Sequence, residues 1–419
     1  MGKKVKEEYI LGGMRLLKYR FWRILWVVAG GLAAAGQGYA ERFVYSYAAG
    51  DRYRVLSTVV EDVYVDRTLS HRAEILNRIA VTVTAAKDGA GTHQATFQTS
   101  ERSIGVQGQN SFQWSREYDS QFERDSLGRF AIAKEYYMPV VRNVPVFPDK
   151  DLAVGETWSA QAEEVHDFRD SFGIAEPYRI PFTANYRYLG MREWNGISYP
   201  TFSVAYRIFD EPKSVRGTLW PTRIMGASDQ IVYWDSKLGQ AAAYEEQFRM
   251  VFELSNGRTV EYRGGAQAEI VEAEPMDRGQ IADEIAQDIE RMGIGDTTVR
   301  VVPEGVSISM EDIRFQPDSA VLMGNEKSKL DQISEILKQY PDRDILVGGH
   351  TALAGTAEGR RQLSQERAAA VADYLIKQGA RTVDRVVVRG YGAEQPVADN
   401  SSEEGKKRNR RVEIILLEN

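Results

Sequence analysis

The feature that most constrains the fold is the segment 345–378, where a short apolar strand leads through a glycine-containing turn into a long helix. Residues 345–349 (ILVGG) are apolar or glycine throughout, which indicates a buried strand. The apolar spacing after the turn predicts a helix over about 357–378. Spacings of four, three and four residues place four side chains on one stripe of that helix: Arg360, Ser364, Arg367 and Val371. The segment therefore predicts a strand whose end meets a helix that carries a basic stripe.

The same segment resembles the core signature of the OmpA-like peptidoglycan-binding domain family. In that family a Gly-His-Thr-Asp turn ends a central strand, and a helix with the pattern N-x-x-L-S-x-x-R-A-x-x-V follows. The positions that fall in register here are Gly349, His350, Thr351, Leu363, Ser364, Arg367, Ala368 and Val371. Two positions depart from the pattern, because Ala352 stands where the family has aspartate and Arg360 where it has asparagine.

Further motifs extend the resemblance from about Val301 to the C-terminus, in the family's order. Residues 313–320 (IRFQPDSA) match the family's first strand and loop, although many relatives carry aspartate where this chain has Gln316. Residues 389–392 (RGYG), Pro396 and residues 409–413 (NRRVE) match the closing motif. The resemblance implies a domain with a mixed sheet and helices on one face, and the order of predicted strands and helices agrees with that implication.

The resemblance also implies a ligand, the diamino acid of a peptidoglycan stem peptide, which presents a carboxylate and an ammonium together. The candidate binding residues that it implies are Arg367, Thr351, Asp318, Ser364, Asn409 and Arg411. The planar fork of an arginine such as Arg367 holds a carboxylate in a bidentate manner. Ala352 removes the family's anion and Arg360 adds a cation, so we expect weaker binding or altered specificity. The alternative for the helix stripe is a solvated basic surface.

Residues 41–272 are predicted to be β-rich. Residues 199–208 alternate between apolar and polar, which is typical of a half-buried strand. The dipeptides Asp88-Gly89, Asn195-Gly196 and Asn256-Gly257 predict hairpin turns. Pro145 and Pro148 suggest a boundary near residue 147, because proline cannot donate within a strand ladder. We therefore expect two β-rich modules, 41–147 and 148–272, each a sandwich or half-barrel.

A transmembrane sheet is the alternative for this region, and it would need charge-free apolar strand faces about ten residues long. Residues 54–66 fail that requirement, because Glu61 lies on the face that carries the valines. We therefore expect a soluble sheet and no transmembrane domain in the mature chain.

Residues 280–292 switch to helical spacing, with Ile281, Ile285, Ile289 and Met292 on one face. This pattern predicts a linker helix within 273–296, followed by the OmpA-like domain at 297–419. The predicted fold class is therefore α+β multidomain, with β-rich N-terminal modules and a C-terminal α/β domain.

The first forty residues have the pattern of a secretory signal peptide. A basic start precedes the 12-residue apolar run Ile24–Ala35, and Gly38-Tyr39-Ala40 supplies small residues at a cleavage site before Glu41. The run is shorter than the roughly 18 residues that a membrane-spanning helix needs. The alternative is an uncleaved inner-membrane anchor. Cleavage predicts a periplasmic protein, associated with the outer membrane or cell wall.

The composition argues against several classes of function. The chain has no cysteine and only four histidines, which show no metal-ligand spacing, and we find no phosphate loop or nucleophile elbow. We therefore expect no cofactor, no metal and no enzymatic activity. A net charge of −7 argues against nucleic acid as a general partner.

These observations predict a non-catalytic envelope protein that associates with peptidoglycan through its C-terminal domain. The alternative is that the OmpA-like fold serves as a structural or protein-interaction module without peptidoglycan binding. In that case the β-rich N-terminal modules bind the ligand, or a partner such as another envelope protein.

Overall fold

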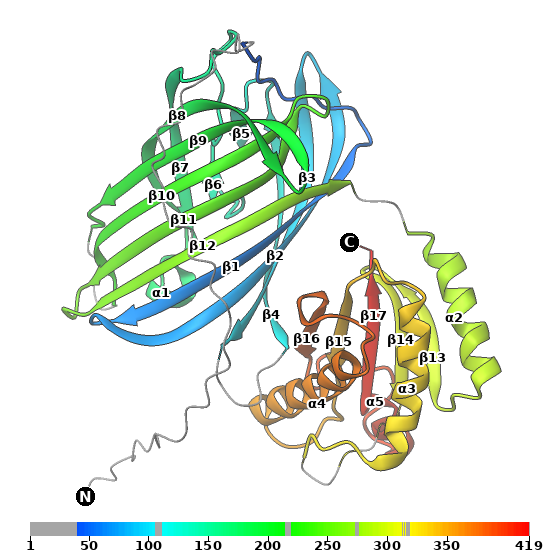
Figure 1. Ribbon diagram of the computed structural model, residues 1–419. Coiled ribbons are helices and arrows are strands. Elements are labelled where there is room, and N and C mark those ends of the chain that lie inside the picture. The colour runs from blue at the N-terminus through cyan, green and yellow to red at the C-terminus, as the bar shows by residue number, and fades with distance from the viewer. Residues whose placement is uncertain are drawn as a thin grey trace, which may run out of the picture. The chain divides into compact units, whose positions relative to one another are not determined.

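The computed structural model describes residues 40–104, 111–213, 219–272, 276–311, 313, 315 and 319–418 (Figure 1). Residues 1–39 of the predicted signal peptide lie outside the described residues, and so do Gln316 and Asp318. The described chain is rich in β-strand and has few helices. None of the helices in these ranges is both long enough and apolar enough to cross a membrane.

The N-terminal part is one antiparallel sheet. Its strands are β1 (Arg52–Val65), β2 (Thr68–Lys87), β3 (Ala90–Ser103), β4 (Phe112–Arg124), β5 (Phe130–Ile132), β6 (Val141–Arg142), β7 (Thr157–His166), β8 (Tyr178–Trp194), β9 (Ile197–Asp210), β10 (Pro221–Asp235), β11 (Gln240–Leu254) and β12 (Thr259–Glu272). The short helix α1 (Arg169–Phe172) follows β7. Neighbours along the chain pair with each other except β5 with β6, and β1 also pairs with β12. The long strands therefore form a single curled sheet (Figure 1).

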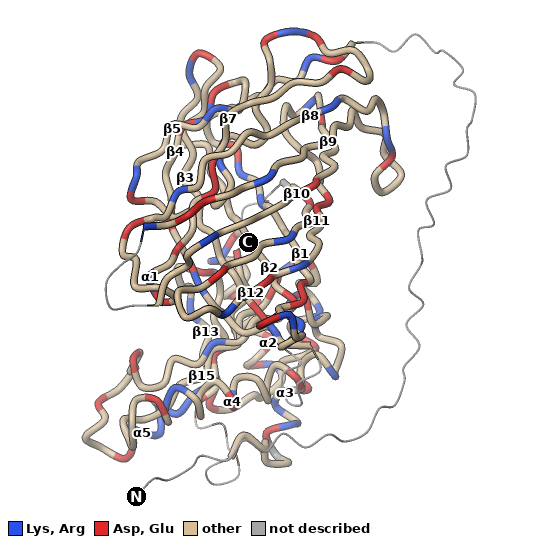
Figure 2. Tube along the Cα trace, turned by 90° about the vertical axis from the view of Figure 1, so that its left-hand side faces the viewer, with Lys and Arg blue, Asp and Glu red and all other residues tan. Residues whose placement is uncertain are grey.

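The pairing of β1 with β12 joins the two ends of this region, from Tyr53 opposite Glu272 to Val65 opposite Val260. The predicted boundary near residue 147 lies between β6 and β7, and strands on both sides of it belong to the same sheet. Acidic and basic residues are interspersed along the strands and are not separated by sign (Figure 2).

Turn chemistry explains two of the hairpins. Asp88 and Asn195 have positive φ angles of 52° and 48°, and each is followed by a glycine with positive φ, as a type I′ turn requires. The predicted alternation in β9 is also confirmed. Its inward side chains, all at most 4% exposed, are Phe202, Val204, Tyr206 and Ile208.

Aromatic side chains fill the core of the N-terminal sheet. The ring of Phe147 lies 4.9 Å from that of Trp234 and 5.4 Å from that of Phe202, both in edge-to-face arrangements. Trp234 and Phe202 are fully buried. Phe147 comes from the loop after β6 and the other two from β9 and β10, so this contact fixes the loop against the inside of the sheet.

The C-terminal part contains α2 (Arg278–Met292), β13 (Thr297–Val302), β14 (Gly305–Glu311), α3 (Gly324–Lys338), β15 (Ile345–Gly349), α4 (Ala357–Lys377), the 3-10 helix η1 (Val383–Arg385), β16 (Val386–Gly390), α5 (Glu403–Asn409) and β17 (Arg411–Leu417). Its strands lie in the order β13-β14-β17-β15-β16. Only β15 and β16 pair in parallel within this set, so the sheet is mixed. The observed α4 ends one residue before the predicted helix end.

Helix α2 begins where the Asp277 side chain accepts a hydrogen bond from the backbone N–H of Gln280, and it ends at Gly293, whose φ is +66°. Its Ile285 and Ile289 are 0% and 7% exposed, and they belong to the same buried cluster as Val306 of β14. The predicted linker helix therefore contributes side chains to the C-terminal core.

We expect Ile285→Ala to lower the free energy of unfolding by about 2–5 kcal/mol, because it leaves a cavity in that core. Gln287→Ala, at an exposed position of the same helix, is the matched control and should change stability by less than about 0.5 kcal/mol. Urea denaturation of both variants measures the difference. Equal stabilities would contradict the placement of α2 in the core.

Candidate functional site

The candidate site is built where the ends of β15 and β16 meet helix α4. Gly349 ends β15, and a Cβ atom there would overlap the carbonyl oxygen of Ser364 in α4. At Gly390, which ends β16, a Cβ atom would lie 2.6 Å from the backbone nitrogen of Gln365. Glycine at both positions therefore lets α4 lie against the strand ends, closer than any side chain would allow.

Ser364 connects this helix to the loop after β16. Its hydroxyl donates to the carbonyl of Arg361 (2.8 Å) and accepts from the N–H of Gly392 (2.9 Å). The N–H of Thr351 donates in turn to the carbonyl of Gly392 (2.8 Å). Ser364 is fully buried, so its hydroxyl holds the loop and the turn after β15 in register with α4.

Thr351 and Ala352 form the turn after β15, and each is 7% exposed. The hydroxyl of Thr351 is buried and has no hydrogen-bond partner among the described residues. A buried hydroxyl without a partner costs about 1–3 kcal/mol. The next position is the alanine that replaces the family's aspartate, so the turn presents an unused hydroxyl and no carboxylate.

Arg367 lies on α4 and is partly buried. Its guanidinium carbon lies 5.0 Å from the ring centroid of Phe315, and its Nε donates to the carbonyl of Ser319 at 3.4 Å. These contacts hold Arg367 against Phe315 and Ser319. Arg367 is therefore in contact with described residues that follow β14.

Arg360 lies near the start of α4, one turn before Ser364. Its Nη1 donates to the carbonyl of Gly355 at 2.6 Å. The guanidinium is therefore bonded to the loop that precedes α4. This places a cation on the same helix as Arg367, at the position where the family has a neutral asparagine.

Asn409 and Arg411 are also buried, at 1% and 4% exposure. The Asn409 carbonyl oxygen accepts from the N–H groups of Val397 and Ala398, at 2.8 and 3.0 Å. The Nε of Arg411 donates to a carboxylate oxygen of Glu413 at 2.6 Å. Both predicted site residues thus make contacts that organise the loop before α5 and the start of β17.

His350, which follows the end of β15, is buried. Its ring stacks on Tyr391, with centroids 4.8 Å apart and planes 8° apart, and its Nε2 lies 3.7 Å from a carboxylate oxygen of Glu413. Burial is the main cause that lowers the pKa of His350. Arg411, whose Nε donates to Glu413, is the permanent cation of this cluster.

Glu413 is the carboxylate that faces both His350 and Arg411. Burial acts to raise its pKa, but the hydrogen bonds and charges of His350 and Arg411 outweigh burial and lower the pKa to about 2. The alternation Arg411-x-Glu413 on one strand is the only sequence signal for this pair, since both side chains point to the same face of β17. No group of three or more metal-binding side chains occurs among the described residues.

Comparison with known proteins places the C-terminal part among characterised domains. The OmpA family model matches residues 314–410. Outer membrane porin F of Pseudomonas aeruginosa is 38% identical over 112 residues, which cover 27% of this chain and 32% of that protein. Peptidoglycan-binding protein ArfA of Mycobacterium tuberculosis is 36% identical over 104 residues, which cover 25% of this chain and 32% of that protein.

A solved structure, the cell wall anchor of the T6SS from Pseudomonas aeruginosa, is 30% identical, and the match covers 34% of this chain and 99% of that chain with a TM-score of 0.29. The chain spans about a third of the length of the two curated relatives above. The similarity therefore concerns the C-terminal domain and not the whole of either relative.

We expect Gly349→Ala to lower the free energy of unfolding by about 3 kcal/mol, because the added methyl group overlaps the Ser364 carbonyl. Gly295→Ala is the matched control, since no atom lies within 4 Å of a Cβ there. Thermal melts of the two variants measure the difference. A Gly349→Ala variant as stable as the control would contradict the close approach of α4.

Glu413 should make stability sensitive to acid. Its folded pKa of about 2 lies below the ordinary 4.5, so its contribution is complete above pH 4.5 and is lost as the pH falls through 2. We expect Glu413→Gln to lower the free energy of unfolding at pH 7 by about 3 kcal/mol. The variant should also lose less stability than the wild type between pH 4.5 and 2.

The matched control for this experiment is Glu403→Gln, since Glu403 is 83% exposed and pairs with Lys406 on the surface. It should change stability by about 0.5 kcal/mol or less. Denaturant titrations across the pH range measure both variants, and an unchanged acid profile in Glu413→Gln would contradict the assignment.

Proposed function

Because residues 314–410 form a domain of the OmpA family, we propose that the chain is a non-catalytic protein of the bacterial envelope that associates with peptidoglycan through this domain. The names of its relatives support the proposal, since they include an outer membrane porin and a peptidoglycan-binding protein. We place the protein in the periplasm, with an α+β multidomain organisation in which the N-terminal sheet lies outside the binding domain.

The observation that carries the proposal is the neighbourhood of Arg367. This arginine is held between Phe315 and the carbonyl of Ser319, so its guanidinium is oriented before a ligand arrives. Pre-organisation lowers the entropy that binding costs. A stem-peptide carboxylate is a suitable partner, because a guanidinium forms paired, charge-assisted hydrogen bonds with it.

The hydroxyl of Thr351 supports the same ligand. It is buried without a partner among the described residues, and a ligand group that hydrogen-bonds to it would remove that cost. Ser364, Asn409 and Arg411 contribute differently in this proposal. Their polar groups hold the loops around the site, so they position the binding face without touching the ligand.

Ala352 and Arg360 make the proposed site weaker than, or different in specificity from, the family pattern. Ala352 offers no anion for the ligand's ammonium. Arg360 adds a cation at the start of α4, and like charges disfavour an ammonium nearby. The loss of one charge-assisted hydrogen bond corresponds to about 1.5–3 kcal/mol, or roughly ten- to a hundredfold in affinity.

Co-sedimentation with purified sacculi tests the proposal. The wild type should pellet with sacculi, and Arg367→Ala should bind roughly tenfold more weakly, because a stem carboxylate then lacks its partner. Arg300→Ala, on the exposed side of β13, is a control that removes an arginine elsewhere in the domain. Unchanged sacculus binding in Arg367→Ala would move the interaction to another part of the chain.

The departures from the family pattern give a gain-of-function test. Ala352→Asp restores the anion, and Arg360→Asn removes a cation that would pair with it. The double variant should bind a diamino-acid stem peptide about tenfold more tightly than the wild type in titration calorimetry. If the wild type binds tightly and no variant improves on it, the pocket is built around Ala352. If no form binds, the fold serves as an interaction module instead.

A further inference from the structure

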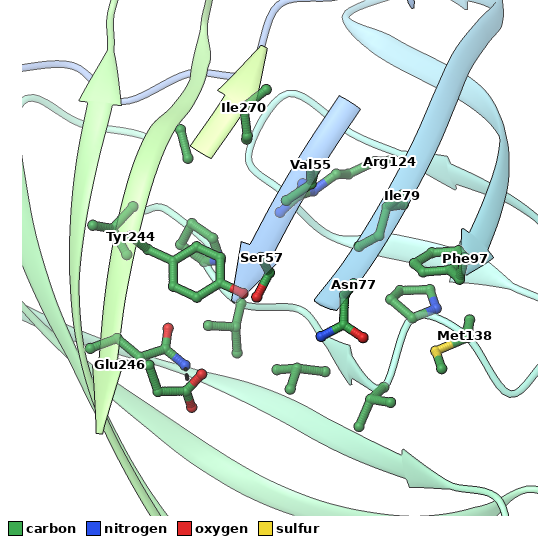
Figure 3. Close-up of a pocket in the computed structure, with 18 of the residues that line it drawn as sticks. Val55, Ser57, Asn77, Ile79, Phe97, Arg124, Met138, Tyr244, Glu246 and Ile270 are labelled. Atoms are coloured by element: carbon green, nitrogen blue, oxygen red, sulfur yellow. Dashed lines mark hydrogen bonds between the residues drawn. The ribbon is translucent and has the colours of Figure 1, made fainter. Parts of the chain in front are cut away.

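The N-terminal sheet lines an open cavity of about 360 Å³ that the peptidoglycan proposal does not use (Figure 3). Ligand pockets in proteins have volumes of about 300–1,000 Å³, so this cavity is at the small end of that range. Most of its wall is apolar and includes Val55, Ile79, Phe97, Met138 and Ile270. These side chains come from strands β1, β2, β3 and β12 and from the loop before β6, so the curled sheet and this loop together form the cavity.

One part of the wall is polar. Ser57, Asn77, Tyr244 and Glu246 all line the cavity, and Figure 3 shows their side chains directed into it. One carboxylate oxygen of Glu246 accepts hydrogen bonds from Ser228 at 2.6 Å and from Gln230 at 3.3 Å. Burial raises the pKa of this carboxyl group, which favours its neutral form inside the sheet.

The cavity wall also contains a cation, Arg124 of β4. Its guanidinium carbon lies 3.8 Å from the ring centroid of Tyr45 and 4.8 Å from that of Phe130. Its Nε is buried and has no hydrogen-bond partner among the described residues. The aromatic faces stabilise the positive charge of Arg124, but they accept no hydrogen bond from the N–H groups in the plane of its guanidinium.

Two other arginines of the N-terminal sheet donate hydrogen bonds to protein oxygens. Arg116, on the same face of β4 as Arg124, donates to Asp167 at 3.2 Å and to Asp170 at 2.8 Å. Arg142 is fully buried and donates to the carbonyls of Pro139 and Tyr136, at 3.1 and 2.6 Å. In contrast, none of the described carboxylates or carbonyls accepts a hydrogen bond from Arg124.

We propose that this cavity binds a small amphipathic carboxylate, with its anionic head on Arg124 and its apolar body along the sheet wall. A charge removed from water is stabilised by a paired and hydrogen-bonded partner, and a planar carboxylate fits a guanidinium. The single cation matches a single negative charge. A phosphate monoester carries about −1.5 to −2 charges at neutral pH, which is more than one arginine neutralises. This proposal is independent of peptidoglycan binding.

Calorimetric titration of the full chain at pH 7.5 with decanoate, decanol, decylamine and decyl phosphate tests the head group, because the four probes share one apolar chain. Decanoate should bind roughly ten- to a hundredfold more tightly than decanol, as expected for one charge-assisted contact. Decylamine and decyl phosphate should bind more weakly than decanoate. Equal affinities for decanoate and decanol, or no binding of any probe, would overturn the proposal.

The Arg124→Gln variant tests whether the carboxylate head of the ligand contacts Arg124. The variant should lose the preference for decanoate over decanol while its affinity for decanol stays the same. Arg129→Gln is the matched control, since Arg129 is 61% exposed and pairs with Asp125, and it should keep the wild-type preference. A preference for decanoate that survives in folded Arg124→Gln would also overturn the proposal.

A third variant tests the cavity itself. Ile79→Trp places a larger side chain in the cavity and should weaken binding of decanoate and decanol alike. If Arg124→Gln fails to fold, as judged by far-UV circular dichroism, the head-group preference of the wild type and the effect of Ile79→Trp decide the question. Undiminished binding of both probes to Ile79→Trp would place them outside the cavity.

Discussion

The C-terminal domain depends on the contact between α4 and the glycines that end β15 and β16. With glycine at 349 and 390, the backbone of α4 lies against the strand ends, and the Ser364 hydroxyl then reaches the loop at Gly392. That loop holds the turn at Thr351. Ser364 and Thr351 are therefore positioned by a backbone contact that a single methyl group would disturb.

Much of this domain could be predicted from the sequence, because its signals are local. Helical spacing located α4 to within one residue of its observed end, and the helix at 280–292 was found from its apolar stripe. The spacing of residues along the helix could not show how deeply each side chain is buried. Ser364 and Arg367 share a stripe, but Ser364 is fully buried beneath the loop at Gly392 while Arg367 is only partly buried.

The features that sequence reasoning missed depend on register and on long-range pairing. Tyr391 and His350 stack because β15 and β16 pair in parallel with one particular register. The pairing of β1 with β12 joins residues about two hundred positions apart along the chain, and no local pattern encodes it. The proline pair near 147 suggested a boundary, yet the strands before and after it share one sheet. Arg124 stood out only when its neighbours were known.

We propose that the face of α4 at Arg367 binds a peptidoglycan stem peptide. The most direct measurement is a nuclear magnetic resonance titration of the full chain, labelled with nitrogen-15, with a stem peptide that contains the diamino acid. Binding at this face should produce saturable shifts of the Arg367 side-chain Nε–H and the Thr351 backbone N–H, with the resonances of Arg300 and Gln287 unmoved. Shifts confined to other residues, or none at all, would contradict binding at this face.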